Sequence, residues 1–105
     1  MYLLHSIVVI IFSLNSFSDP LSIIKKLKVE DGFSVEIFID EIDTPRQIAE
    51  SKAGNIFVGS RSAGTISVIN KNKDIRIIAE GLSNSTGVTY HDGDLYFSEV
   101  NSIWK

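Results

Sequence analysis

The sequence predicts an all-β protein, specifically an incomplete β-propeller with one full four-stranded blade and the start of a second, preceded by a signal peptide. Two observations predict this fold. Short runs of β-branched and aromatic residues alternate with glycine, asparagine and aspartate, and a strand-turn-strand pattern recurs after about 40 residues. We therefore divide the chain into a signal peptide over 1–18, an N-terminal segment over 19–32 and a partial propeller over 33–105.

The first 18 residues contain no Lys, Arg, Asp or Glu and are followed by Asp19 and Pro20. The apolar run from Leu3 to Leu14 is shorter than the ~20 residues that span a bilayer as a helix, and small residues precede Asp19. These features predict cleavage after Ser18. The usual basic start is missing, so an uncleaved membrane anchor is the alternative.

The remaining chain has the periodicity of strands. Apolar residues alternate with other residues from Phe33 to Ile39, which predicts a strand with one apolar face. The stretch Leu21–Val29 is the one candidate helix, and its pattern is too brief to decide. Four further strands joined by tight turns are expected over 47–51, 56–60, 65–70 and 75–79.

The internal repeat selects among β folds. Pro45–Ala49 aligns with Ser85–Thr89, and Gly54–Val58 aligns with Gly93–Phe97. A period near 40 residues with four short strands is typical of a propeller blade, which buries its faces against neighbouring blades. A plain meander and a sandwich are the alternatives. Fewer than about three repeats leave edges and faces uncovered, so we expect the chain alone to be marginally stable or prone to aggregate.

Composition excludes several classes of function. Ten Lys and Arg residues oppose 13 Asp and Glu residues without a basic block, which argues against nucleic acid as a partner. The absence of cysteine excludes disulfides, thiolate metal sites, a cysteine nucleophile and a lipidated cysteine. No phosphate-binding glycine loop, nucleophile elbow or paired-histidine motif is present.

The repeat region also resembles a known family. The segments carrying the resemblance are EDGFSVEIF at 30–38, TPRQIA at 44–49, GNIFVGSRSAGTISVI at 54–69 and IIAEGLSNSTGVTYHDGDLYFSEVNSIWK at 77–105. Together they resemble the start of a glucose/sorbosone dehydrogenase, a soluble sugar dehydrogenase that depends on pyrroloquinoline quinone (PQQ). The resemblance runs from Leu27 to Lys105, although related propellers share glycine-led strands of this kind.

The resemblance implies PQQ and calcium as cofactors and a sugar substrate for the intact protein. It also implies that the catalytic histidine, the quinone-binding arginines and the calcium ligands lie in later blades, so no catalytic residue and no metal ligand is assigned to this chain. Ser85 and Thr86 depart from the family, which commonly has proline before the asparagine and glycine of the second blade.

Blade geometry places the entry loops and the loops between second and third strands at one rim. The residues expected there are Asp43, Arg46, Arg61, Ser62, Asn84, Ser85, Thr86, Glu99 and Asn101. Since the family binds quinone and sugar at the entry-loop rim, Arg46 and Arg61 are the candidate cofactor-binding residues. A guanidinium group can form paired hydrogen bonds with a carboxylate. The alternative is that both arginines brace the rim through Asp43 or backbone carbonyls.

The remaining candidates have a structural interpretation. The opposite rim is expected to hold Lys52, Asn55, His91 and Asp92. His91 precedes a strong Asp-Gly turn signal and is expected to be an exposed turn residue. The run Asp40–Asp43 lacks the ligand spacing of an EF-hand, and Glu99 is expected at a strand end. Asn84–Thr86 fits a glycosylation acceptor, which matters only in a eukaryotic secretory pathway.

Two hypotheses of function follow. The chain is the N-terminal part of an exported, periplasmic or secreted PQQ-dependent aldose or sorbosone dehydrogenase, inactive by itself. Alternatively, it is a non-enzymatic exported propeller that acts as a binding module, or a truncated remnant. No stable membrane span is expected once the signal peptide is cleaved.

Overall fold

The computed structural model describes residues 19–105, so the predicted signal peptide over 1–18 lies outside the described residues. The chain divides into two compact units, one ending at Ile37 and the other running from Phe38 to Lys105. Within the described part of the first unit, a short helix α1 covers Pro20–Ile24. Asp19 caps this helix, because its Oδ1 accepts a hydrogen bond of 3.1 Å from the amide of Leu21.

The helix α1 is short for a simple reason. Asp19 and Pro20 favour the start of a helix, but no side chain of α1 is buried. Because a helix without packing contacts is not stabilised beyond its first turn, α1 ends at Ile24. It occupies the start of the stretch that the sequence left undecided. No helix among residues 19–105 is long and apolar enough to cross a membrane.

The strand predicted over Phe33–Ile39 is wrong. These residues belong to no strand, and Phe33 is 75% exposed. The alternation of apolar residues predicts which side chains share a face, but a strand also needs a neighbouring backbone to accept and donate its hydrogen bonds. No described strand pairs with this segment.

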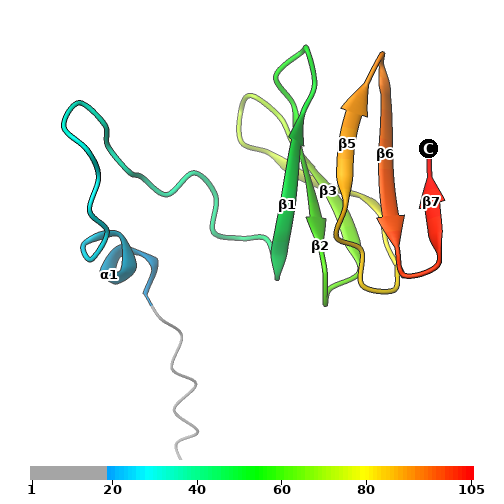
Figure 1. The fold of residues 1–105 in the computed structure, drawn as a ribbon, viewed down its shortest axis with the longest axis horizontal. Helices are drawn as coiled ribbons and strands as arrows, with labels where there is room; N and C mark the ends of the chain where they lie inside the picture. The colour runs from blue at the N-terminus through cyan, green and yellow to red at the C-terminus, as the bar shows by residue number, and fades with distance from the viewer. Residues whose placement is uncertain (1–18) are drawn as a thin grey trace, which may run out of the picture. The chain divides into compact units, whose positions relative to one another are not determined.

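The second unit is all-β and consists of two antiparallel sheets with strands in sequence order (Figure 1). Each strand pairs with the strand that follows it within its sheet, and tight turns join them. Sheet 1 contains β1 (Pro45–Glu50), β2 (Ile56–Ser60), β3 (Thr65–Ile69) and β4 (Ile75–Ala79), and sheet 2 contains β5 (Val88–His91), β6 (Asp94–Glu99) and β7 (Ser102–Trp104).

The four strands expected between residues 47 and 79 are confirmed, with bounds that differ by no more than two residues. The aligned turns also share their backbone conformation. Thr44 and Asn84, one residue before the aligned Pro45 and Ser85, have φ values of 45° and 49°. Gly54 and Gly93, at the aligned hairpin turns, have φ values of 82° and 85°. The sequence repeat is therefore also a repeat of backbone structure.

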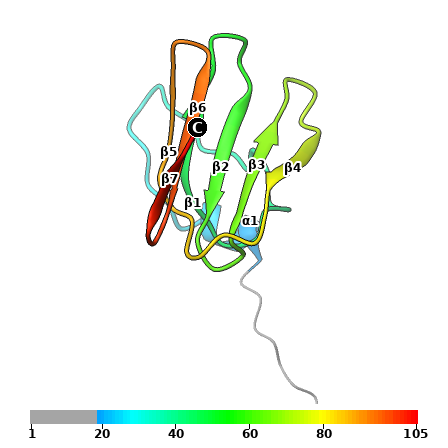
Figure 2. The same ribbon diagram turned by 90° about the vertical axis from the view of Figure 1, so that its right-hand side faces the viewer.

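Sheet 2 packs on one face of sheet 1, over β1 and β2 (Figure 2). Residues paired across antiparallel strands share a face, so Gln47, Phe57, Gly59 and Ile66 lie together. We call this the covered face of sheet 1. The rings of Phe57 and Tyr90 stack there with centroids 6.1 Å apart. The buried apolar residues of the unit are Val58, Ile66, Ile69 and Val88.

Glycine permits the close approach of the two sheets. A Cβ atom added to Gly59 would lie 2.7 Å from the carbonyl oxygen of Thr86 and 3.2 Å from Cγ1 of Val88. A larger residue at position 59 would therefore push β5 away from β2.

Candidate functional site

The rim at the start of β1 is built around Thr44. Its carbonyl accepts a hydrogen bond of 3.2 Å from the amide of Arg61, and its Oγ1 accepts one of 3.1 Å from the amide of Ala63. The entry loop of sheet 1 and the turn between β2 and β3 are thus held together. This confirms that the segments carrying Arg46 and Arg61 share one rim.

The second repeat contributes to the same rim. The amide of Leu82 donates to the carbonyl of Gly64 at 3.0 Å, and the amide of Val100 donates to the carbonyl of Ser83 at 3.0 Å. The turn between β2 and β3, the loop before β5 and the turn after β6 are therefore neighbours. This is the arrangement expected from the order of strands in a blade.

Glu99 fixes this end of sheet 2. Its Oε2 accepts a hydrogen bond of 2.8 Å from the amide of Ser83, and its Oε1 accepts one of 3.0 Å from Nε1 of Trp104. The carboxylate thus joins the entry loop to β7. Both oxygens are occupied, so the prediction that Glu99 is a strand-end residue is confirmed and its role is structural.

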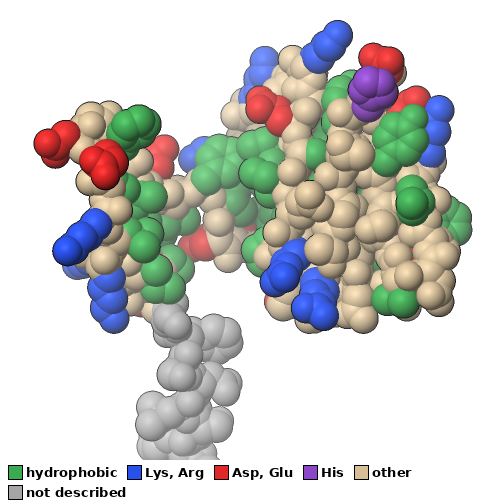
Figure 3. Space-filling model, viewed as in Figure 1, with side chains coloured by type: hydrophobic (Ala, Val, Ile, Leu, Met, Phe, Trp, Pro, Cys, Tyr) green, Lys and Arg blue, Asp and Glu red, His purple; other side chains and the backbone are tan. Residues whose placement is uncertain are grey.

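Arg46 and Arg61 are both exposed at this rim. Neither guanidinium forms an ion pair or hydrogen bond with any residue from 19 to 105, so the expected bracing through Asp43 or backbone carbonyls is not observed in that range. Figure 3 shows basic side chains in blue at both ends of the sheets. Two uncommitted guanidinium groups at one rim suit a ligand that carries carboxylates.

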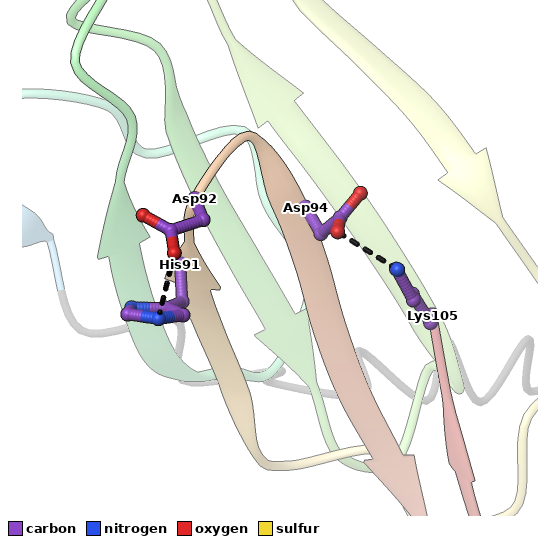
Figure 4. Close-up of polar contacts among 4 residues, drawn as sticks. All are labelled: His91, Asp92, Asp94 and Lys105. Atoms are coloured by element: carbon purple, nitrogen blue, oxygen red, sulfur yellow. Dashed lines mark ion pairs between the residues drawn. The ribbon is translucent and has the colours of Figure 1, made fainter.

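The opposite rim carries two exposed ion pairs near the β5–β6 hairpin (Figure 4). Nε2 of His91 lies 3.2 Å from Oδ2 of Asp92, and Nζ of Lys105 lies 2.9 Å from Oδ2 of Asp94. The hydrogen bond with Asp94, together with the charge of this carboxylate, raises the pKa of Lys105. His91 is exposed, as predicted, but it is the last residue of β5 and pairs with Asp94 instead of lying in the turn.

A depression of about 360 Å³ at the opposite rim brings together Lys52, His91 and Asp92. Asn55, which was expected beside them, instead lines a second depression of about 380 Å³ with Asp74 and Arg76. The opposite rim therefore carries two separate depressions, one between the β1–β2 and β5–β6 hairpins and one between Asn55 and the β3–β4 hairpin.

Sequence analysis missed the contact that ties the two sheets together. Oε1 of Gln47 accepts a hydrogen bond of 3.1 Å from the amide of Val88, and this amide begins β5. The two residues are 41 positions apart, so no local pattern announces the bond. The alignment of Gln47 with Gly87 was an available signal, because it marks a side chain present in only one repeat.

Two serine hydroxyls and the acidic side chains are the remaining polar groups that could take part in a site. Ser60 and Ser85 are fully buried, and their Oγ atoms have no hydrogen-bond partner among the described residues. Between residues 19 and 105, no three His, Asp or Glu side chains gather in a way that could hold a metal ion.

Comparisons with known proteins give one relative. The chain is 43% identical over 79 residues to an uncharacterized protein of Borreliella burgdorferi, a match that covers 74% of this chain. The match covers 21% of the relative, so the chain spans about a fifth of the relative's length. No protein-family model matches the sequence. No solved structure matches it either.

Proposed function

We propose that this chain forms the opening part of an exported β-propeller protein of the PQQ-dependent sugar dehydrogenase type. The observation that carries the propeller proposal is the stacking of two consecutive antiparallel sheets with the same strand order and the same turn conformations. A propeller is built by stacking such sheets around an axis. The assignment to sugar dehydrogenases rests on the sequence resemblance.

The length of the relative supports a larger assembly. Because 79 residues make up 21% of it, the Borreliella burgdorferi protein has about 380 residues, which leaves room for several more repeats of ~40 residues. In our proposal, the catalytic histidine, further quinone-binding arginines and the calcium ligands are supplied by such repeats.

Within this chain, the entry-loop rim has a binding role. Arg46 and Arg61 would hold carboxylate groups of PQQ, for which their uncommitted guanidinium groups are suited. PQQ, when bound, accepts the hydride of the sugar. The hydrogen bonds of Thr44 and Glu99 keep the rim loops in place, so that the arginines are presented from fixed positions.

The experiment is to express the complete gene product, load it with PQQ and measure aldose-dependent reduction of an artificial acceptor together with the PQQ dissociation constant. Arg46→Lys and Arg61→Lys keep the charge but lose the paired hydrogen bonds. We expect each to weaken PQQ binding about tenfold, which is ~1.4 kcal/mol. Arg76→Lys, on exposed β4, is the matched control and should leave PQQ binding unchanged. Absence of PQQ binding by the complete protein would overturn the proposal.

A second candidate function is a non-enzymatic binding module. The observation that favours it is an apolar groove of about 300 Å³ that is lined by residues of sheet 2 and by Gln47, and that includes neither Arg46 nor Arg61. In that case the complete protein would bind neither PQQ nor sugar, and Arg46 and Arg61 would have no effect on its binding partner.

A further inference from the structure

The face of sheet 2 around Ile103 is apolar, and no described strand covers it. The pairing of β5, β6 and β7 places Tyr96 and Ser98 on this face together with Ile103. A groove of about 300 Å³ runs along the face, and Ile103 is 80% exposed. The ion pair of Asp94 with Lys105 borders it at the opposite rim. An apolar centre with a charged border is typical of a contact surface.

This face matches the covered face of sheet 1. Ser98 takes the place of Gly59 in the alignment of the repeats. Ile103 pairs with Ser98 in sheet 2, and Ile66 pairs with Gly59 in sheet 1. Ile66 is completely buried because β5 packs on its face, whereas Ile103 is exposed. Sheet 2 therefore presents the same half of an interface that sheet 1 already uses within this chain.

A longer protein of repeated sheets supplies the other half of such an interface. The matched 79 residues are 21% of the Borreliella burgdorferi relative, which therefore has about 380 residues. Several more repeats of ~40 residues fit into that length. Each repeat of a stacked array contacts the repeats before and after it, so the repeat that follows sheet 2 lies against the face around Ile103.

We propose that the face of sheet 2 around Ile103 is the docking surface for the next repeat of a longer polypeptide, whose first strand packs on it as β5 packs on β1 and β2. The inference rests on the propeller part of the proposed function and not on PQQ binding. It also specifies the docking strand. That strand carries a β-branched apolar residue at the position of Val88, which is 5% exposed where it meets Gly59.

Ser98 gives this contact a feature that the contact between sheets 1 and 2 lacks. A Cβ atom at position 59 would lie 2.7 Å from the carbonyl oxygen of Thr86, so only glycine allows that spacing. Ser98 carries a Cβ atom and a hydroxyl at the equivalent position.

The hydroxyl of Ser98 has a hydrogen to donate across the contact. Its Oγ accepts a hydrogen bond of 3.2 Å from the amide of Gly87, and a serine hydroxyl can accept and donate at the same time. In the proposal, Ser98 donates to the carbonyl that takes the place of Thr86 in the next repeat. The two sheets stand farther apart at this point than at Gly59, because a hydroxyl lies between them.

The test is the reactivity of a cysteine introduced on this face in the complete gene product. Ile103→Cys is treated with a maleimide under native conditions, and the modified peptide is quantified by mass spectrometry. Val100→Cys is the matched control, because Val100 is 63% exposed in the turn after β6. We expect Ile103→Cys to react about tenfold more slowly than Val100→Cys, or slower still, since the next repeat must open before the thiol is reached.

A second substitution tests the position of Ser98. Ser98→Val replaces the hydroxyl with a bulkier apolar group and removes the donor. Added to Ile103→Cys, it should raise the labelling rate, because the next repeat can no longer approach as closely. Added to Val100→Cys, it should leave the rate unchanged. An unchanged rate for Ile103→Cys in the presence of Ser98→Val would contradict the contact at Ser98.

The other outcomes are distinct. Equal labelling rates for Ile103→Cys and Val100→Cys would overturn the proposal and leave the groove free for a ligand from outside the chain, as in the second candidate function. Protection of Ile103→Cys that is lost on dilution would overturn it by assigning the face to a second molecule. Because labelling needs no cofactor, protection in a protein that does not bind PQQ would reject the sugar dehydrogenase assignment and support this inference.

Discussion

The two sheets share strand order and turn conformation, yet they differ in how their matching faces are used. Ile66 on sheet 1 is completely buried and Ile103 on sheet 2 is 80% exposed, although the two residues hold equivalent positions. The difference comes from the neighbouring strands. β5 packs against the face of sheet 1 that carries Ile66, whereas no described strand covers the face of sheet 2 that carries Ile103. In a repeat structure, burial is thus a property of the stacked pair rather than of the single sheet.

The largest expected difference between the sheets is at these two isoleucines. Ile66→Ala leaves a cavity between the sheets and should lower the free energy of unfolding by about 3 kcal/mol. Ile103→Ala removes exposed atoms and should change it by less than about 0.5 kcal/mol. Urea denaturation of both variants checks this. Equal losses at both positions would mean that the face of sheet 2 around Ile103 is covered in solution.

The close contact at Gly59 gives the next largest effect. Gly59→Ala places a Cβ atom against the backbone of Thr86, and we expect a loss of about 2 kcal/mol because two backbone segments must separate. Gly93→Ala is the control. It has nothing within 4 Å but carries a φ of 85°, so its cost is conformational and about 1 kcal/mol. A smaller loss for Gly59→Ala than for Gly93→Ala would contradict the sheet packing.

The hydrogen bond from the Val88 amide to Gln47 can be removed with little change in side-chain size. Gln47→Leu leaves the amide of Val88 without its acceptor, which should cost about 1 to 2 kcal/mol. Gln47→Glu keeps an acceptor oxygen and should cost less. Hydrogen exchange at the Val88 amide is the direct measurement, and it should become faster in Gln47→Leu. Unchanged exchange in that variant would show that the bond is not formed.

The strands could be predicted from the sequence, whereas the side-chain contacts between the sheets could not. The strands of sheet 1 follow from local alternation and from turn residues such as Gly54, since both signals lie within a few positions of the element they define. The bonds from Val88 to Gln47 and from Ser83 to Glu99 join residues 41 and 16 positions apart in the chain, so no local signal encodes them. The strand predicted over Phe33–Ile39 was wrong for a different reason. Its local pattern was clear, but no described strand pairs with this segment.

Only part of the candidate rim was predictable in this way. The order of strands was enough to bring Arg46 and Arg61 to one rim, which needs only the alternation of strand direction. The absence of a partner for either guanidinium among residues 19–105 depended on side-chain geometry that the sequence does not specify.

Glu99 offers a smaller test, at the rim of sheet 2. Glu99→Ala removes the acceptor of the Ser83 amide and of Nε1 of Trp104, and we expect a loss of about 1 kcal/mol because both donors can reach water. Trp104 fluorescence should shift toward that of a fully hydrated indole. Glu99→Gln keeps one acceptor and should give an intermediate shift. An unchanged emission spectrum in Glu99→Ala would contradict the bond to Trp104.

The ion pair between Lys105 and Asp94 should give the smallest effect, because both side chains are well exposed and salt screens them. The hydrogen bond and charge of Asp94 raise the pKa of Lys105 in the folded state above that of the unfolded chain. The folded state therefore holds this proton more tightly, and the stabilisation is fully present below the unfolded pKa. It is lost as the pH rises through the folded pKa. Comparing the wild type with Lys105→Gln in urea at increasing pH measures the effect: the difference in stability should vanish at alkaline pH and at high salt, and a difference that grows with pH would contradict the pairing.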